Sequence, residues 1–380
     1  MVLVAHASLP RRDADKSIAE GDEPVVNPFA YDIEGNDQPI GRDAALKRAR
    51  KFPFIVAQAE MYGAYVKGAY AGDSDAMIQA HPQLDLSMYL NGTHMNSDAV
   101  ARYNPPNDWF VLDGNGTRVR AGGDWSNNYL MDPLSGYIDW LVEMTGPKLE
   151  RCRYNSLYVD ELGVGPITSL ADGIGKPIDR RTGQPWTWAT WMPEMAAVAQ
   201  RFSADFDVPI RTNGLGNGLR FFDPDPEMRG EDSSGPTSQM LPFCDSALAE
   251  SFIRGATTVK PGGADYWPTL TALEREIRML EVAGPKAWAC SKIWITRSDT
   301  FKEQVHRFCL GTFMLGAAPG AAWTFTKQKA TTVTPFHPLW ARARSLGAPL
   351  GARNGLVRQF QHGEVRVDAT RHDATFTIAT

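Results

Sequence analysis

The feature that most limits how this chain folds is a series of short apolar runs separated by segments with helical periodicity. Eight of these runs are predicted as strands: 52–61, 84–93, 127–133, 155–163, 208–216, 246–252, 286–294 and 321–326. Most are continuously apolar, which is typical of strands buried on both faces of a parallel sheet. In one intervening segment, Leu273, Ile277 and Leu280 share a helical face and Gly284 follows as a stop signal. Eight strands alternating with helices predict an α/β fold, the (β/α)8 or TIM barrel.

Three regions are expected along the chain. Residues 1–45 are polar and without period, and we interpret them as an N-terminal extension. Residues 46–333 are predicted to form the catalytic barrel. Residues 334–380 contain period-two alternation, which predicts a short C-terminal antiparallel β segment packed on the barrel. Within the barrel region, DGNG flanked by β-forming residues indicates a hairpin at 110–119, inserted after the second predicted strand.

Composition argues against several classes of partner and cofactor. The 380 residues carry a net charge of −5, without the basic surplus that binding to nucleic acid requires. No apolar run reaches the ~20 residues of a membrane span. No secretory signal is recognised, and the location is left open between cytosolic, extracellular and virion-associated. The histidines lack HxH or HExxH pairing and the four cysteines lack CxxC spacing, so we expect no metal, no cofactor and buried free thiols. The oligomeric state is not predicted.

Polar and aromatic residues gather where the predicted strands end, and the carboxyl ends of the strands carry the active site of a TIM barrel. Alternation along 155–163 places Tyr158 and Asp160 toward the barrel axis, with Glu161 just past the strand. We predict Asp160 and Glu250 as the catalytic carboxylates and Glu161 as a rival. The predicted substrate-binding residues are Glu60, Tyr62, Tyr89, Asn91, Asp132, Arg211, Asn213, Lys292, Trp294 and Trp323.

Several of these residues also have a purely structural interpretation. Asp160 is compatible with a loop or capping acid, and Glu250 with a salt bridge at the barrel rim. Asp132 is followed by proline, a common start of a helix. Arg211 is expected inside the barrel one layer below Asn213, where its charge must be paired. We predict that its partner is Asp160 or Asp132.

Paired carboxylates with aromatic neighbours favour glycoside hydrolysis, in which one acid protonates the leaving oxygen and the other attacks or stabilises the sugar carbon. The sequence has no GxSxG motif, no P-loop and no GxGxxG that opens a helix, so other common chemistries lack support. With an arginine nearby, Asp160 is predicted to stay ionised as nucleophile or base. Glu250, among apolar neighbours, is predicted to have the higher pKa and to act as the acid. We prefer a retaining mechanism.

The motifs LMDPLSGYIDWL, NSLYVDELG, VPIRTNGLG, ALAESFIRG and FCLGTFMLGAAPGAAWTF, in this order, resemble a family of glycoside-hydrolase-like TIM barrels catalogued as hypothetical glycosyl hydrolases. These barrels look like distant relatives of polygalactosaminidase-type barrels. The resemblance covers roughly residues 50–375 and implies a TIM barrel with a carbohydrate substrate. It matches Asp160 within YVDE and Glu250 within AESF. The sequence departs from the family in the double acid of YVDE and in the long insertion at 164–189.

The favoured function is therefore a glycosidase that cleaves a microbial poly- or oligosaccharide. The alternative is a non-catalytic carbohydrate-binding barrel, such as a surface or virion attachment module, which needs aromatic residues but no paired acids. The insertion brings Trp186, Trp188 and Trp191 close to the end of the fourth predicted strand. There they either stack on sugar rings or cover the barrel rim.

Overall fold

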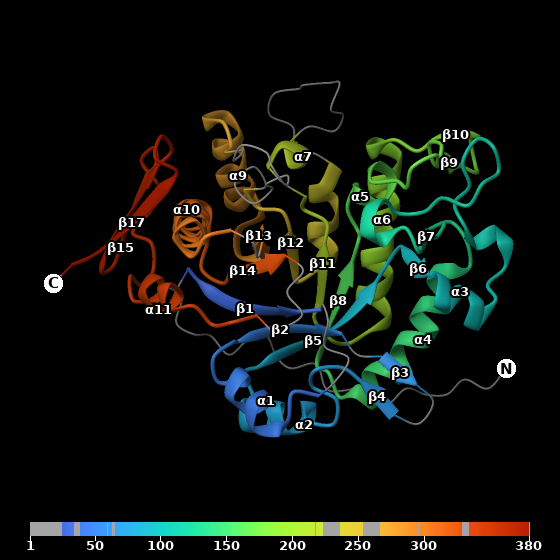
Figure 1. The fold of residues 1–380 in the computed structure, drawn as a ribbon, viewed down its shortest axis with the longest axis horizontal. Coiled ribbons are helices and arrows are strands. Elements are labelled where there is room, and N and C mark those ends of the chain that lie inside the picture. The colour runs from blue at the N-terminus through green and yellow to red at the C-terminus, as the bar shows by residue number, and fades with distance from the viewer. Residues whose placement is uncertain are drawn as a thin grey trace.

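A closed barrel of eight parallel strands forms the centre of the computed structural model (Figure 1). The structure describes residues 25–33, 39–58, 60–62, 65–216, 218–222, 236–253, 267–294, 297–328 and 334–379. The barrel strands are β1 (Asn27–Asp32), β2 (Phe54–Gln58), β5 (Asp85–Asn91), β8 (Ser156–Asp160), β11 (Ile210–Asn213), β12 (Ser246–Ala249), β13 (Ala287–Trp294) and β14 (Ala322–Gln328). Their order around the barrel is β1-β14-β13-β12-β11-β8-β5-β2, and β1 pairs with both β14 and β2. The predicted TIM barrel is confirmed.

Two predicted features of the barrel are wrong, and the two errors compensate. β1 lies in the segment predicted as an N-terminal extension, and every residue of β1 after Asn27 is buried. The run 127–133 instead contains β7 (Asn128–Leu130), which pairs antiparallel with β6 (His94–Asn96) outside the barrel. One strand is gained and one is lost ahead of β8. The predicted fourth to eighth strands therefore keep their places around the barrel.

Helices cover the outside of the barrel (Figure 1). They are α1 (Arg42–Ala49), α2 (Ser74–Ala80), α3 (Ser97–Tyr103), α4 (Tyr137–Cys152), α5 (Gly165–Thr168), α6 (Trp188–Asp205), α7 (Gly218–Phe222), α9 (Leu270–Ala283), α10 (Asp299–Gly316) and α11 (Pro338–Arg344). Short 3₁₀ segments are η1 (Asn107–Trp109), η2 (Gly123–Trp125), η3 (Pro236–Phe243) and η4 (Gly284–Lys286). In α9 the residues Leu273, Ile277 and Leu280 are buried, as their spacing predicts. Among the described helices, none combines the length and apolar character needed to cross a bilayer.

An inserted lobe is built from the loops that follow β5 and β8 (Figure 1). It contains β6, β7, β9 (Ile178–Asp179) and β10 (Gln184–Pro185), and a separate small hairpin, β3 (Glu60–Tyr62) and β4 (Tyr65–Lys67), follows β2. The hairpin predicted around DGNG is confirmed, since Asp113 N–H donates to the Thr117 carbonyl at 2.9 Å and Gly116 has a φ of 76°. Asp113 Oδ2 also accepts a hydrogen bond from Gly175 N–H at 3.0 Å, which ties the two inserted loops together.

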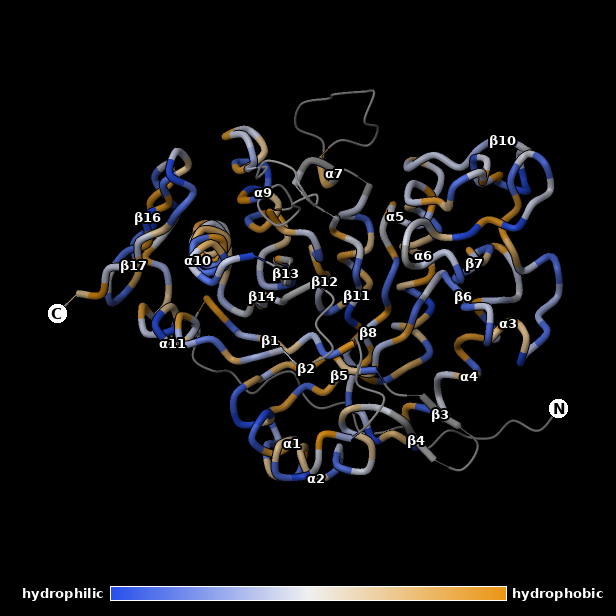
Figure 2. Tube along the Cα trace, viewed as in Figure 1, coloured by the Kyte–Doolittle hydropathy of each residue, from blue (hydrophilic) through white to orange (hydrophobic). Residues whose placement is uncertain are grey.

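The C-terminal residues form a three-stranded antiparallel sheet beside α10, as predicted (Figure 1). Its strands are β15 (Val357–Phe360), β16 (Gly363–Asp368) and β17 (Asp373–Ile378). Val365 and Val367 are buried while Arg366 between them is exposed. This alternation, visible as mixed hydropathy along the strands in Figure 2, lets one face of the sheet pack on the barrel domain. The segment predicted as β also contains the helix α11.

The barrel interior has its own apolar cluster, separate from the layer between sheet and helices. Its buried members are Phe29, Tyr31, Val56, Tyr158, Leu248, Trp288, Cys290 and Ala322. Tyr158 and Leu248 confirm the predicted alternation, because Asp160 and Glu250 lie two residues further along the same segments and point into the barrel mouth. All four cysteines are buried and free, as expected.

Candidate active site

Two carboxylates and one amide meet at the C-terminal end of the barrel. Asp160 ends β8, Asn213 ends β11, and Glu250 directly follows β12. The side-chain nitrogen of Asn213 donates to Asp160 Oδ1 and to Glu250 Oε2, each at 2.6 Å. These two oxygens therefore lie at most about 5.2 Å apart, twice the hydrogen-bond length. The amide reaches both acids because β11 lies between β8 and β12 in the sheet.

Asp160 lies on an aromatic floor made of three tyrosines. Its side chain is buried, and its Oδ2 accepts a hydrogen bond from Tyr89 Oη at 2.6 Å. Its Oδ1 also accepts from the backbone N–H of Glu161 at 2.8 Å. The ring of Tyr89 stacks on that of Tyr158, and the hydroxyl oxygens of Tyr158 and Tyr31 are 3.4 Å apart. These contacts fix the Asp160 carboxyl group on both of its oxygens.

Lys292 from β13 supplies a positive charge to the site. Its Nζ lies 2.5 Å from Glu250 Oε1 and 5.7 Å from the centroid of the Tyr31 ring. The ion pair is only partly exposed, with 21% of the Lys292 side chain and 26% of the Glu250 side chain accessible. Glu250 therefore has a cation on one oxygen and the Asn213 amide on the other.

Glu161 has an unusual backbone for a non-glycine residue. Its φ is 63°, in the left-handed region, and its carbonyl accepts a hydrogen bond from Thr93 Oγ1 at 3.3 Å. The next N–H, that of Leu162, donates to the Asn213 carbonyl at 2.9 Å. Strain of this kind is common in functional sites. Glu161 thus remains a third carboxyl group at the site, as predicted.

The three carboxyl groups interact, and their pKa values follow from their different surroundings. Burial and the charge of Glu250 raise the pKa of Asp160 to about 6, although Tyr89 and Asn213 donate to it. Burial, Asp160 and Glu250 raise the pKa of Glu161 well above its usual value. Burial also acts to raise the pKa of Glu250, but the charge and hydrogen bond of Lys292, together with the hydrogen bond from Asn213, lower this pKa to below its usual value. The predicted order, with Asp160 the stronger acid, is therefore wrong.

The cause of that error is the position of Arg211. Arg211 is buried inside the barrel one layer below Asn213, as predicted, but its partner is Asp85 at the start of β5. It also donates to Ser246 Oγ at 2.9 Å, and its guanidinium lies 4.8 Å from the ring of Trp288. The predicted pairing with Asp160 or Asp132 is wrong, because the long side chain reaches toward the N-terminal end of the barrel. Arg211 therefore contacts residues of the barrel floor and is not placed to bind substrate.

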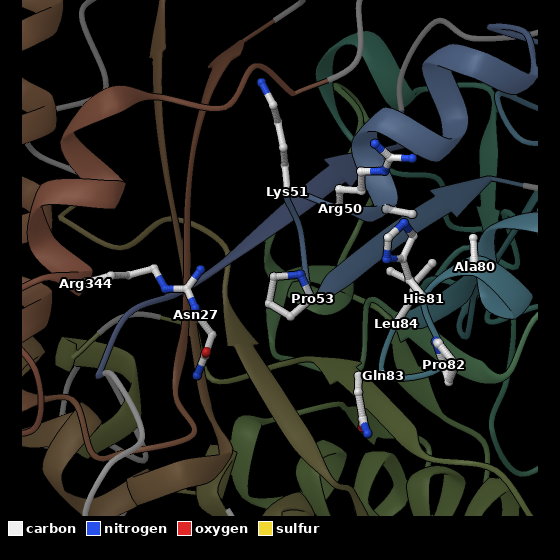
Figure 3. Close-up of a pocket in the computed structure, with 11 residues that line it drawn as sticks. Asn27, Arg50, Lys51, Pro53, Ala80, His81, Pro82, Gln83, Leu84 and Arg344 are labelled. Atoms are coloured by element: carbon white, nitrogen blue, oxygen red, sulfur yellow. The ribbon is translucent and has the colours of Figure 1, made fainter.

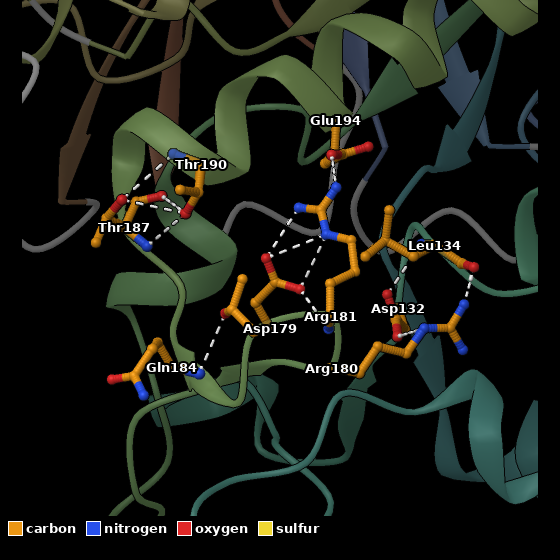
Figure 4. A network of polar contacts seen from close by, with 10 residues as sticks. Asp132, Leu134, Asp179, Arg180, Arg181, Gln184, Thr187, Thr190 and Glu194 are labelled. Atoms are coloured by element: carbon orange, nitrogen blue, oxygen red, sulfur yellow. Dashed lines mark hydrogen bonds and ion pairs between the residues drawn. The ribbon is translucent and has the colours of Figure 1, made fainter.

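Asp132 belongs to the inserted lobe, and Figure 4 shows it beside Arg180. It forms an ion pair with Arg180 at 3.1 Å and accepts a hydrogen bond from Leu134 N–H at 2.9 Å. In the same lobe, Arg181 bridges Asp179 and Glu194 (Figure 4). Asp132 was predicted to end a barrel strand at the site, but the run 127–133 is not a barrel strand. The structural interpretation, a helix that starts at Asp132, is not observed either, because the N-cap of α4 is Gly136 and Asp132 shapes the turn before it.

The other predicted residues divide into three groups. Asn91 Oδ1 accepts hydrogen bonds from the N–H groups of Thr93 and His94, at 3.1 and 2.8 Å, and shapes the turn that leads to β6. Trp323 is fully buried between sheet and helices, where it packs on Phe252, so its assignment to substrate binding is wrong. The side chains of Glu60, Tyr62 and Trp294 lie outside the described part of the structure.

The tryptophans of the insertion cover the rim of the barrel more than they offer an exposed surface for sugar rings. Trp191 is fully buried, and its Nε1 donates to the Gly163 carbonyl at 3.0 Å. Trp186 is 6% exposed and packs edge-on against Trp191. Only Trp188 of the three is partly exposed. Covering of the barrel rim is therefore the interpretation that fits Trp186 and Trp191.

One cluster away from the barrel mouth has the residue types of a metal site. Ligand atoms of Glu303, His306 and His337 lie within 4.8 Å of one another. His306 Nε2 already accepts a hydrogen bond from Trp340 Nε1 at 2.7 Å, and His337 accepts one from Leu339 N–H at 3.1 Å. A neutral His306 that accepts on Nε2 carries its proton on Nδ1, which leaves no lone pair for a metal. The cluster instead links α10 to α11, with His337 bonded to Glu303.

The residue of the site that sequence reasoning missed is Tyr31. It ends the apolar part of β1 and contributes to the aromatic floor opposite Tyr158. The signal was present as the buried run NPFAYD, which has the length of a barrel strand.

Comparisons with known proteins bear on the fold. No family model matches the sequence, and no curated protein is similar to it. The glycoside hydrolase domain of PelA from Pseudomonas aeruginosa is 12% identical over 80% of this chain and 95% of that one, with a TM-score of 0.45. The α-galactosidase AgaB from Geobacillus stearothermophilus is 11% identical over 93% of this chain and 47% of its own, with a TM-score of 0.46.

A cycloisomaltooligosaccharide glucanotransferase from Paenibacillus sp. is 11% identical over 73% of this chain and 39% of its own, with a TM-score of 0.46. The chain thus spans less than half the length of the last two proteins. At such identities the similarity concerns the fold alone. The chain is distantly similar in structure to the TIM-barrel domains of glycoside hydrolases.

Proposed function

We propose that the protein is a retaining glycoside hydrolase that cleaves a poly- or oligosaccharide with the Asp160–Glu250 pair. The observation that carries this proposal is the bridge from Asn213 to both carboxylates, which limits their nearest oxygens to at most about 5.2 Å. Carboxyl groups roughly 5–5.5 Å apart are typical of retaining glycosidases, whereas inverting ones need roughly 6.5–9.5 Å to admit a water molecule. The pair also lies at the barrel end where TIM-barrel enzymes carry their active sites.

The charges around the pair favour Glu250 as the nucleophile and Asp160 as the proton donor. Lys292 keeps Glu250 ionised, which suits attack on the anomeric carbon. Asp160, with a pKa raised to about 6, holds a proton more readily and donates it to the leaving oxygen. In the second step Asp160 takes a proton from water, and the resulting hydroxide releases the sugar from Glu250. These roles are the reverse of those predicted from the sequence.

The proposal is tested by screening a panel of polysaccharides for release of reducing ends. Asp160→Asn and Glu250→Gln should each lower turnover by a factor of about a hundred or more. An aryl glycoside with an activated leaving group needs little acid assistance, so the Asp160 variant should still release the aryl group in a rapid first step, whereas the Glu250 variant should not. Hydrolysis of the glycosyl-enzyme should stay slow in the Asp160 variant, because this second step needs Asp160 as the base. Binding of glycans without turnover on the whole panel would instead support the carbohydrate-binding barrel. If the aryl glycoside rescues the Glu250 variant and not the Asp160 variant, then Glu250 is the proton donor and Asp160 is the nucleophile.

If both variants keep near-full activity on a substrate that the parent cleaves, the pair is not the catalytic pair. Glu161→Gln is then the next variant to measure, because Glu161 is the remaining carboxyl group that interacts with both acids. The same panel also compares Asn213→Ala, which should lower turnover while leaving both acids in place.

A further inference from the structure

A pocket opens at the end of the barrel opposite the carboxylates. It has a volume of about 440 Å³ and is lined by residues at the N-terminal ends of three strands: Asn27 begins β1, Pro53 precedes β2 and Leu84 precedes β5. This volume lies within the range of roughly 300–1,000 Å³ that small-molecule sites occupy. Asp85, which pairs with Arg211, directly follows Leu84 of the pocket lining.

The side chains around this pocket have one sign of charge. Arg50, Lys51 and Arg344 line it together with His81, and none of its lining residues is acidic (Figure 3). Figure 3 shows Arg344 on one side of Pro53, with Arg50 and His81 on the other side. The chain as a whole has a net charge of −5, so the local excess of cations does not reflect a basic protein.

These cations also lack carboxylate partners. Within the described part of the chain, Arg50, Lys51 and Arg344 form no ion pair, whereas many other arginines do, such as Arg48 with Asp32. Lys51 Nζ lies 5.6 Å from the centroid of the Phe336 ring. Nε2 of His81 is buried and has no hydrogen-bond partner among the described residues.

We propose that this basic pocket binds a sugar-sized molecule that carries a phosphate or sulfate group. Guanidinium groups match the oxygens of tetrahedral anions in planar, paired hydrogen bonds, and they remain charged at all physiological pH values. The apolar residues Pro53, Pro82 and Leu84 in the lining suit the uncharged body of such a ligand.

A purely structural account of these cations makes a different prediction. Arg50 caps the C-terminal end of α1 and Arg344 ends α11, and positive charge at these positions stabilises the helix dipole without any ligand. That account predicts no saturable binding of anions. A measurement of anion binding therefore distinguishes the two accounts, whereas a measurement of protein stability does not.

The test is isothermal titration calorimetry of the full chain with glucose 6-phosphate, glucose 6-sulfate and glucose, at constant ionic strength. We expect saturable binding of at least one of the two anionic probes and no saturable binding of glucose. The affinities for glucose 6-phosphate and glucose 6-sulfate, compared with each other, identify the preferred anionic group. The double variant Arg50→Ala, Arg344→Ala should weaken this binding by about tenfold or more. Arg42→Ala, at the exposed start of the same helix as Arg50 but outside the pocket, should leave it unchanged.

Absence of saturable binding by both anions overturns the proposal, and so does binding that survives in the double variant or that weakens equally in the Arg42 variant. Circular dichroism establishes that each variant is folded. The inference does not depend on glycoside hydrolysis, because the double variant should keep any turnover measured on the polysaccharide panel.

Discussion

Glu276 on α9 is a buried acid whose replacement by glutamine should stabilise the protein. Its side chain is 6% exposed, it accepts hydrogen bonds from the backbone N–H groups of Gly218 and Ile253, and its Oε2 has no partner among the described residues. Burial raises the pKa of Glu276 from 4.5 to about 8. Two N–H donors are therefore too few to offset the loss of hydration, and the group is neutral in the fold at pH 7.

The size of the effect follows from linkage between protonation and folding. The folded protein holds the Glu276 proton more tightly than the unfolded chain does, so unfolding releases this proton between pH 4.5 and about 8. The free energy of unfolding therefore falls as the pH rises through that window. Each pKa unit corresponds to about 1.4 kcal/mol, which gives a cost of about 3 kcal/mol at pH 7 and about 5 kcal/mol above pH 8.

Glutamine cannot ionise and can still accept both backbone hydrogen bonds through its carbonyl oxygen. Urea unfolding of the parent and of Glu276→Gln across pH 4 to 9 should give equal stabilities near the acid end. The variant should be more stable by about 3 kcal/mol at pH 7. Glu143→Gln, at an exposed position of α4, controls for loss of one negative charge. A stability difference that stays constant with pH would refute the argument, because it would mean that Glu276 does not titrate differently in the fold.

Three further predictions concern other buried contacts. Asp85→Ala should lower the free energy of unfolding by about 3–5 kcal/mol, measured with urea, since it leaves the Arg211 charge buried without a carboxylate; a loss below about 1 kcal/mol would show that water already solvates this guanidinium. Lys292→Met removes the cation that lowers the pKa of Glu250, so the acidic limb of the pH–rate profile should move to higher pH on any substrate that the parent cleaves. If this limb does not move, ionisation of Glu250 does not determine its position. Trp191→Phe removes the hydrogen bond to the Gly163 carbonyl and should cost about 1–2 kcal/mol in thermal or urea unfolding, with no measurable cost counting against a structural role for this indole.

Much of the fold could be predicted because the pattern of buried strands is local. The run SLYVD is buried at every position, and the alternation that placed Tyr158 and Asp160 toward the axis holds in the structure. Asp160, Asn213 and Glu250 come together because each ends or follows a strand and their three strands are adjacent. Strand ends can be read from a sequence, and convergence then follows from the closed barrel.

The errors arose where a contact depends on the reach of a side chain. Arg211 lies in the predicted layer, but sequence position does not say whether its long side chain extends toward Asp160 or toward Asp85 at the other end of the barrel. The predicted order of the pKa values of Asp160 and Glu250 was wrong because it assumed an arginine beside Asp160, and Arg211 extends away from this residue. The ion pair between Lys292 and Glu250 determines which acid stays ionised. Predicting this ion pair requires the distance between two side chains on neighbouring strands, which the sequence does not provide.

The pairing of β1 with β14 has a consequence for how the chain is made. Asn27 donates a hydrogen bond to the Ala321 carbonyl across 294 residues of sequence, so the first barrel strand to leave the ribosome must wait for the last. Until β14 is synthesised, β1 and β13 each keep an open parallel edge, which is a surface for pairing with other chains. A chain interrupted before β14 is therefore an aggregation hazard and not a smaller barrel. Conversely, a circular permutation that joins the ends and opens the chain elsewhere would make β14 and β1 consecutive barrel strands, so that they could pair before the rest of the barrel is made.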